Sequence, residues 1–192
     1  LLNIAARSLP SEVDAVAWID ADVIFQNKSW VKDTLECLKE NAICQLFETC
    51  VRLDIDGNVG RIPDTAESFA SVMNRLPGAM SAQRYDTHRH TGYAWAMHRE
   101  IFDELGLYEH AISGSADHFM AHAIFDDYGF CVRTALKQDE NQIKHLKEWG
   151  DKFFLHTQGE IGVVRGEIKH LWHGELKNRN YFNRMHEITD LG

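Results

Sequence analysis

Residues 15–22 read Ala-Val-Ala-Trp-Ile-Asp-Ala-Asp, an apolar run that ends in two carboxylates. A short apolar run predicts a strand buried on both faces. Because burying an ionised carboxylate alone is costly, acids at the end of such a strand need partners or a cation. In an extended chain Asp20 and Asp22 point to the same side, and paired carboxylate oxygens suit Mg²⁺ or Mn²⁺. The run therefore predicts a metal site, but Asp-x-Asp is common, and one acid could instead cap a turn.

Strands and helices alternate along the rest of the chain, which predicts one α/β domain over residues 1–192. We expect strands at 15–19, 43–51, 91–97, 161–164 and 168–171, and helices at 1–9, 67–76, 99–105, 139–149 and 178–188. A further helix should begin at Gly114-Ser115. The first helix already contains Leu1, so we expect the chain to start partway through a larger protein.

Composition excludes some classes of function. The chain has 192 residues and a formal net charge of −9, so it lacks the basic footprint of a nucleic-acid binder. No apolar run is long enough to cross a membrane. The four cysteines form no Cys-x-x-Cys motif, and we interpret them as reduced core residues of a cytoplasmic protein.

Asp117 is the candidate catalytic residue. It lies in the first turn of the helix opened by Gly114-Ser115, where the helix dipole favours a carboxylate. Its functional interpretation is a general base that accepts the proton of a substrate hydroxyl. The simpler alternative is that Asp117 only stabilises the start of the helix.

The segment His170-Leu171-Trp172-His173 could complete a metal site with Asp22, because imidazole nitrogen and carboxylate oxygen bind the same divalent metals. Either histidine could instead be an ordinary core residue. Tyr93, Trp95 and Trp172 are candidates for stacking on a sugar, although aromatic residues on strands more often belong to a core. Arg165 could contact a phosphate.

A second metal-binding pattern is possible on one helix. His118 and His122 are four residues apart, which can place two ligands on one face, and Asp126 follows one turn later. Phe119 stands where a zinc protease would require Glu. A helix face with solvated or hydrogen-bonded histidines explains the pair at least as well.

The order of these motifs resembles the second half of a GT-A glycosyltransferase of the family 2 type. The resemblance runs from about Ala15 to Arg184 and includes Asp20-Ala21-Asp22, the segment 92–102, Leu105-Gly106-Leu107-Tyr108-Glu109, Gly114-Ser115-Ala116-Asp117 and a late histidine. It implies a mixed sheet flanked by helices that lacks its N-terminal strands. Two residues depart from the family pattern: Ala116 stands where many members have Glu, and Leu107 stands where many have Gly.

The resemblance also implies roles for the site residues. Asp22 would bind Mn²⁺ or Mg²⁺ on the diphosphate of a nucleotide sugar, and Asp20 would bind the metal or the ribose. Asp117 would deprotonate a carbohydrate or other hydroxyl acceptor in an inverting reaction, and His170 or His173 would complete the metal site. Two rival functions stay open: a metallohydrolase of phosphate esters that uses His118, His122, His170 and His173, and an inactive domain for carbohydrate binding or assembly.

Overall fold

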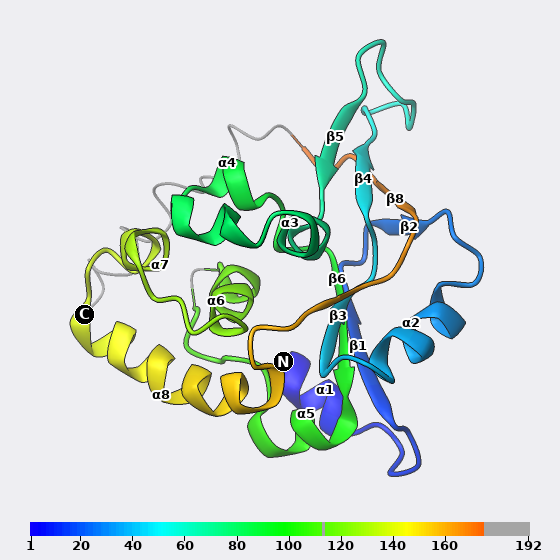
Figure 1. Cartoon of the computed structure of the whole chain (residues 1–192). Helices are drawn as coiled ribbons and strands as arrows, with labels where there is room; N and C mark the ends of the chain where they lie inside the picture. Colours follow the sequence, from blue (N-terminus) through cyan, green and yellow to red (C-terminus); the bar gives the residue numbers. More distant parts are fainter. Residues whose placement is uncertain (113, 175–192) are drawn as a thin grey trace.

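A computed structural model describes residues 1–112 and 114–174 of the chain. It has an α/β architecture with two four-stranded mixed sheets flanked by helices, which agrees with the predicted class. The first sheet has the strand order β1-β6-β3-β7 and the second the order β2-β8-β4-β5. In Figure 1, α3, α6 and α8 lie on one side of the first sheet and α2 lies on the other.

The element bounds are as follows. The strands are β1 Ala15–Ile19, β2 Val23–Phe25, β3 Ile43–Gln45, β4 Thr49–Arg52, β5 Asp64–Glu67, β6 Ala94–His98, β7 Gly162–Val163 and β8 Glu167–His170. The helices are α1 Leu2–Arg7, α2 Trp30–Leu38, α3 Phe69–Arg75, α4 Tyr85–His88, α5 Arg99–Leu105, α6 Ala116–Ala123, α7 Phe130–Ala135 and α8 Glu140–Thr157, with a 3₁₀ helix η1 at Pro77–Ala82.

Three strands of the first sheet continue directly into the second. β1, β3 and β7 are followed in the chain by β2, β4 and β8, so the sheets join at three short crossings. The first crossing is Asp20-Ala21-Asp22, and a hydrogen bond from the Val23 amide to the Asp20 carbonyl (3.2 Å) closes its turn. The two acids therefore lie where the chain changes sheets.

This position corrects two expectations about the opening run. β1 is an edge strand paired only with β6, so it is not buried on both faces. Val16 is 2% exposed, whereas Ile19 is 37% exposed, an alternation typical of a strand with one covered face. Asp20 and Asp22 sit in a turn instead of on one extended strand.

Helix packing forms the main core and places α6 near the site. The largest cluster of buried side chains joins the first sheet to α3, α5, α6 and α8, and its bulkiest buried members include Trp95, Phe102 and Phe153. α8 is capped by Asp139, whose carboxylate accepts from two backbone amides, and the helix runs eight residues past the predicted end at 149. Its buried face continues through Gly150 and Phe153, which explains the extension.

Several element predictions are confirmed and others need correction. β1 and α5 have the predicted bounds. The expected strand 43–51 is divided into β3 and β4 by a crossing, and β2 and β5 were not predicted. The predicted helix 178–188 lies outside the described residues. Among the described residues, the cysteines are all free thiols and no helix is long and apolar enough to span a membrane.

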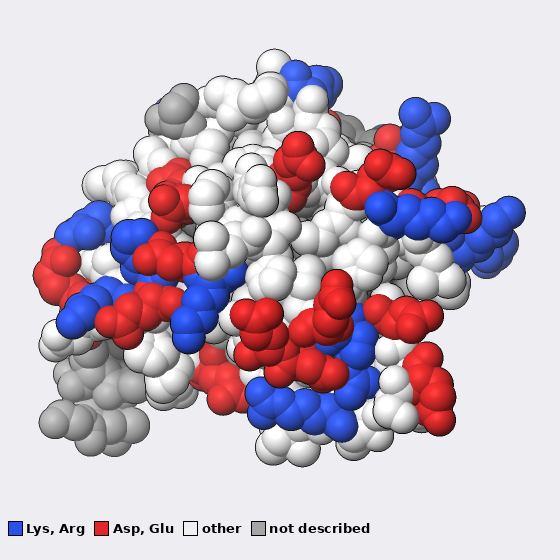
Figure 2. Space-filling model, turned by 60° about the horizontal axis from the view of Figure 1, so that its bottom comes forward, with Lys and Arg blue, Asp and Glu red and all other residues white. Residues whose placement is uncertain are grey.

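Acidic and basic side chains are mixed on the face that lies at the bottom of Figure 1. Figure 2 shows Lys and Arg there interspersed with Asp and Glu, without a continuous basic surface on that face. This distribution agrees with the net charge of −9.

Candidate active site

Strand register brings Asp22 to His170. β8 pairs antiparallel with β2 so that His170 lies opposite Val23, the residue after Asp22. The Leu171 amide donates to the Asp22 carbonyl at 2.9 Å and locks this end of the pair. His173 follows the strand closely, and the chain turns its imidazole back toward Asp22. The predicted grouping of Asp22 with a late histidine is therefore present in the fold.

The three side chains have the spacing of ligands around one cation. Asp22 Oδ2 lies 3.4 Å from Nε2 of His170 and 3.4 Å from Nε2 of His173. These distances exceed the ~2.7–2.9 Å of a strong charge-assisted hydrogen bond. Two ligand atoms that each lie about 2.1 Å from a shared divalent cation are about 3.0–3.4 Å apart. The donor set of one carboxylate and two imidazoles thus fits a divalent metal.

Asp20 adds a second carboxylate with an altered acidity. The residue is exposed, yet protein atoms crowd its carboxyl group, and this desolvation raises the pKa of Asp20 from 3.8 to about 6. The negative charges of Asp22 and Asp117 raise that pKa further, whereas His173 lowers it. A cluster of carboxylates that repel one another is the setting in which a cation binds favourably.

Asp117 faces the same region from α6. Its Oδ2 accepts a hydrogen bond from the Thr91 hydroxyl at 3.3 Å, and its charge acts on Asp20. Gly92 makes this approach possible, because a Cβ at that residue would lie 2.8 Å from Asp117 Oδ2. Ser115, the residue before α6, has a φ of 70°, a strained value of the kind that clusters at functional sites.

A row of rings supports His170 from behind. Tyr93 stacks on His90 with centroids 3.9 Å apart and lies against His170 at 4.8 Å. The Tyr93 hydroxyl accepts from Arg52 Nε at 3.0 Å. Tyr93 is 7% exposed, so its predicted role as a stacking surface for an acceptor is wrong. It instead fixes the orientation of His170.

The other two aromatic candidates differ in exposure. Trp95 is 1% exposed and donates from Nε1 to the Thr91 carbonyl at 2.8 Å, so it belongs to the core and cannot stack on a sugar. Trp172 is 43% exposed between the two histidines and stays a candidate for acceptor binding.

Arg165 does not join this group. It lies before β8, at the opposite end of the strand from His170, and its carbonyl accepts from Asn27. Five residues of extended chain span roughly 16 Å. The prediction that Arg165 binds the same nucleotide phosphates as Asp22 is therefore not supported by its position.

A groove beside Asp20, Asp22 and Asp117 is lined by other residues and contains none of these three carboxylates. Its volume is about 970 Å³, near the upper size of ligand sites. β4, β5 and α3 supply most of its walls, which carry acidic and basic side chains together. His90 and Arg52 line it, and both also contact Tyr93, so the ring row forms the boundary between the groove and Asp22.

His118 and His122 belong to a different cluster. They lie with His88 and Cys131. The acid beside them is Asp127, which lies 3.5 Å from His122 Nδ1. The predicted Asp126 instead pairs with Lys147. Burial lowers the pKa of His88 to about 4 and also lowers that of His118, so both imidazoles are neutral at neutral pH. Sequence reasoning missed His88 and Cys131 as members, because only the spacing of His118 and His122 signalled a site.

Comparison with known proteins finds no similar protein. The chain matches no protein-family model, no curated protein and no solved structure, so its function must be inferred from the residues themselves.

Proposed function

We propose that the chain is the catalytic domain of a metal-dependent glycosyltransferase with a GT-A fold, which transfers a sugar with inversion from a nucleotide diphosphate to a hydroxyl acceptor. The observation that supports it best is the grouping of potential metal ligands in space. Asp22, His170 and His173 come from distant parts of the sequence, and their ligand atoms lie within 4.8 Å of one another, with Asp20 and Asp117 close by.

The proposed metal would be held by Asp22, His170 and His173. A divalent cation bound there would stabilise the negative charge of the leaving diphosphate. Asp20, whose pKa is raised by the negative charge of Asp22, would bind the cation or a ribose hydroxyl of the nucleotide sugar. The row formed by His90, Tyr93 and His170 keeps one metal ligand rigidly oriented.

Asp117 would accept the proton of the acceptor hydroxyl as that oxygen attacks the anomeric carbon. Two observations support this role: the Thr91 hydroxyl donates to its carboxylate, and its charge is close enough to raise the pKa of Asp20, the neighbour of the proposed metal ligand Asp22. Trp172, exposed beside His173, would offer an aromatic face to the acceptor sugar.

The test is to incubate the full-length protein with a panel of nucleotide sugars and Mn²⁺ and to measure release of nucleoside diphosphate. We expect release with one donor class, loss of release with a chelator, and no release from Asp22→Asn. If no donor reacts while Mn²⁺ is present, the proposal fails.

The two rival functions make different observable predictions. A two-metal phosphate hydrolase built on four histidines finds little support, because His118 and His122 cluster with His88 and Cys131 instead of with Asp22. An inactive binding domain is favoured by Ala116, which stands where many family 2 glycosyltransferases have Glu, and by the expected lack of the N-terminal strands. Calorimetric titration of Mn²⁺ and nucleotide separates the cases, since binding of both argues for the enzyme.

A further inference from the structure

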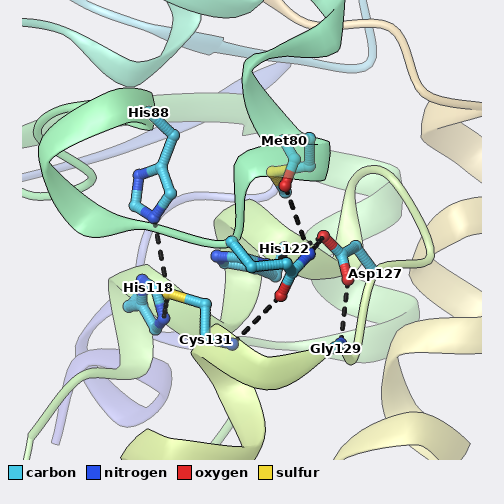
Figure 3. A network of polar contacts seen from close by, with 8 residues as sticks. Met80, His88, His118, His122, Asp127, Gly129 and Cys131 are labelled. Atoms are coloured by element: carbon cyan, nitrogen blue, oxygen red, sulfur yellow. Dashed lines mark hydrogen bonds and ion pairs between the residues drawn. The ribbon is translucent and has the colours of Figure 1, made fainter.

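Four potential metal ligands meet in the interior between α4, α6 and α7. His88 ends α4, His118 and His122 lie one turn apart on α6, and Cys131 lies in the first turn of α7. Figure 3 shows the Cys131 sulfur between the rings of His88 and His118, with His122 beside them. One ligand atom from each residue lies within 4.8 Å of every other.

Distances in the cluster match tetrahedral coordination. Cys131 Sγ lies 3.6 Å from His88 Nε2 and 3.4 Å from His118 Nε2. Around a tetrahedral zinc ion, a sulfur ligand at about 2.3 Å and a nitrogen ligand at about 2.05 Å are about 3.6 Å apart. The side chains therefore need little movement to surround one ion.

The three histidines of the cluster are buried, and one of their ring nitrogens has no hydrogen-bond partner among the described residues. His88, His118 and His122 are each at most 1% exposed. Nε2 of His122 is buried and makes no hydrogen bond with any residue that the structure describes. A buried polar atom without a partner typically costs about 1–3 kcal/mol, so such atoms call for a partner. A metal ion would supply one.

Two further contacts lie at ring nitrogens of His88 and His122. Asp127 Oδ2 lies 3.5 Å from His122 Nδ1, and the Arg89 carbonyl lies 3.1 Å from His88 Nδ1. In metal sites, the ring nitrogen that does not bind the ion usually donates to a carboxylate or a carbonyl. Asp127 is itself held by the Gly129 amide at 2.8 Å.

We propose that His88, His118, His122 and Cys131 bind one zinc ion in a buried structural site. Thiolate and imidazole ligands favour zinc over Mg²⁺ or Mn²⁺, and four protein ligands complete a tetrahedron without an open position. The ion would fasten α4 and α7 to α6. This proposal is independent of the glycosyltransferase assignment, because it shares no ligand with the cluster of Asp22, His170 and His173.

The two metal sites can be distinguished by cobalt substitution. Co²⁺ bound to a thiolate shows a sulfur-to-metal charge-transfer band, which a site of carboxylate and imidazoles cannot produce. The protein, purified without a histidine tag, should contain about one equivalent of zinc, and the cobalt-loaded form should show this band. Asp22→Asn should keep it.

Variants of the cluster sharpen the test. Cys131→Ser should lose the band and the zinc, whereas the half-buried control Cys37→Ser should retain both. Asp127→Asn should keep the band but weaken metal binding by about 10–100-fold, the usual effect of losing an orienting contact. Zinc added to the metal-free wild type should raise its melting temperature.

The proposal is overturned if the cobalt-loaded wild type shows no thiolate band, or if the band survives in Cys131→Ser. Should Cys131→Ser fail to fold, the wild-type spectrum and the comparison with Cys37→Ser still decide the matter. If the band also disappears in Cys37→Ser, Cys131 is not the specific thiolate ligand, and the proposal is contradicted.

Discussion

Asp117 and His118 are consecutive residues of α6, yet their side chains belong to different clusters. Asp117 accepts from Thr91 and acts on Asp20, whereas His118 lies 3.4 Å from Cys131 Sγ. The start of one short helix thus joins the proposed active site to the proposed zinc site. Rigid attachment of His118 would also fix the position of the adjacent carboxylate.

Asp117→Asn should lower the turnover number by about 10²–10⁴-fold with little effect on donor affinity, because a general base acts in the transition state. Steady-state kinetics with the donor identified in the panel would measure this. Glu100→Gln, which removes a first-turn carboxylate from α5, is the matched control and should be nearly neutral. An equal loss of donor binding in Asp117→Asn would mark Asp117 as structural.

Asp22→Asn should abolish Mn²⁺-dependent nucleotide binding while the fold stays intact. The Asp22 side chain is 27% exposed and belongs to a turn between two strands, so its replacement by the isosteric Asn removes no core packing. Calorimetry measures the binding and circular dichroism the fold, with Asp14→Asn at the other end of β1 as control. Unchanged nucleotide affinity would refute the ligand role.

Gly92→Ala should impair activity and lower the free energy of unfolding by about 1–3 kcal/mol, the usual cost of overpacking. The added Cβ would lie 2.8 Å from Asp117 Oδ2 and 3.0 Å from His90 Cε1, so at least one of them must move. Gly78→Ala is the control, since no atom lies within 4 Å of its Cβ. Urea unfolding and kinetics of the two variants provide the comparison, and equal behaviour would contradict the close contact.

Asp20 should make stability depend on pH in the absence of metal. Its pKa rises from 3.8 to about 6 on folding, chiefly by desolvation, so the folded protein binds this proton more tightly than the unfolded chain. The stabilisation is complete below pH ~4 and is lost as the pH rises through ~6. Asp20→Asn should therefore gain stability relative to wild type across that window.

Urea unfolding of wild type and Asp20→Asn in chelator, at several pH values from 4 to 7, measures the difference in the free energy of unfolding. Asp14→Asn controls for the loss of an exposed carboxyl group. A difference that stays constant with pH would show that folding does not perturb Asp20. Saturating Mn²⁺ should reduce the difference, since a cation offsets the repulsion among the carboxylates.

Local pattern predicted the elements whose residues pack at regular intervals. Ala15–Ile19 and Arg99–Leu105 were predicted with the bounds that the structure shows. The short strand Val23–Phe25 was missed because it has little signal of its own and is held by pairing with β8, far along the chain. The same pairing brings His170 to Asp22, a grouping that ligand chemistry and the family resemblance both suggested but that the local pattern could not place.

The sequence shows the chemistry of each side chain, but which side chains lie together was harder to predict. Trp95 and Tyr93 have the chemistry of sugar-stacking residues, but burial removes both from solvent. Cys131 was interpreted as a plain core cysteine, and its sulfur instead faces His88 and His118. A sequence shows which side chains can bind metal, whereas their meeting depends on helix packing between distant segments.

Sequence alone predicts the α/β class, the carboxylates at the end of β1 and the supply of imidazoles, because periodicity and side-chain chemistry are local properties. Tertiary structure decided how these groups are divided: Asp22 with His170 and His173, and His118 and His122 with His88 and Cys131. The physical reason is that strand register and helix contacts, which set distances between remote residues, are settled only when the whole core packs.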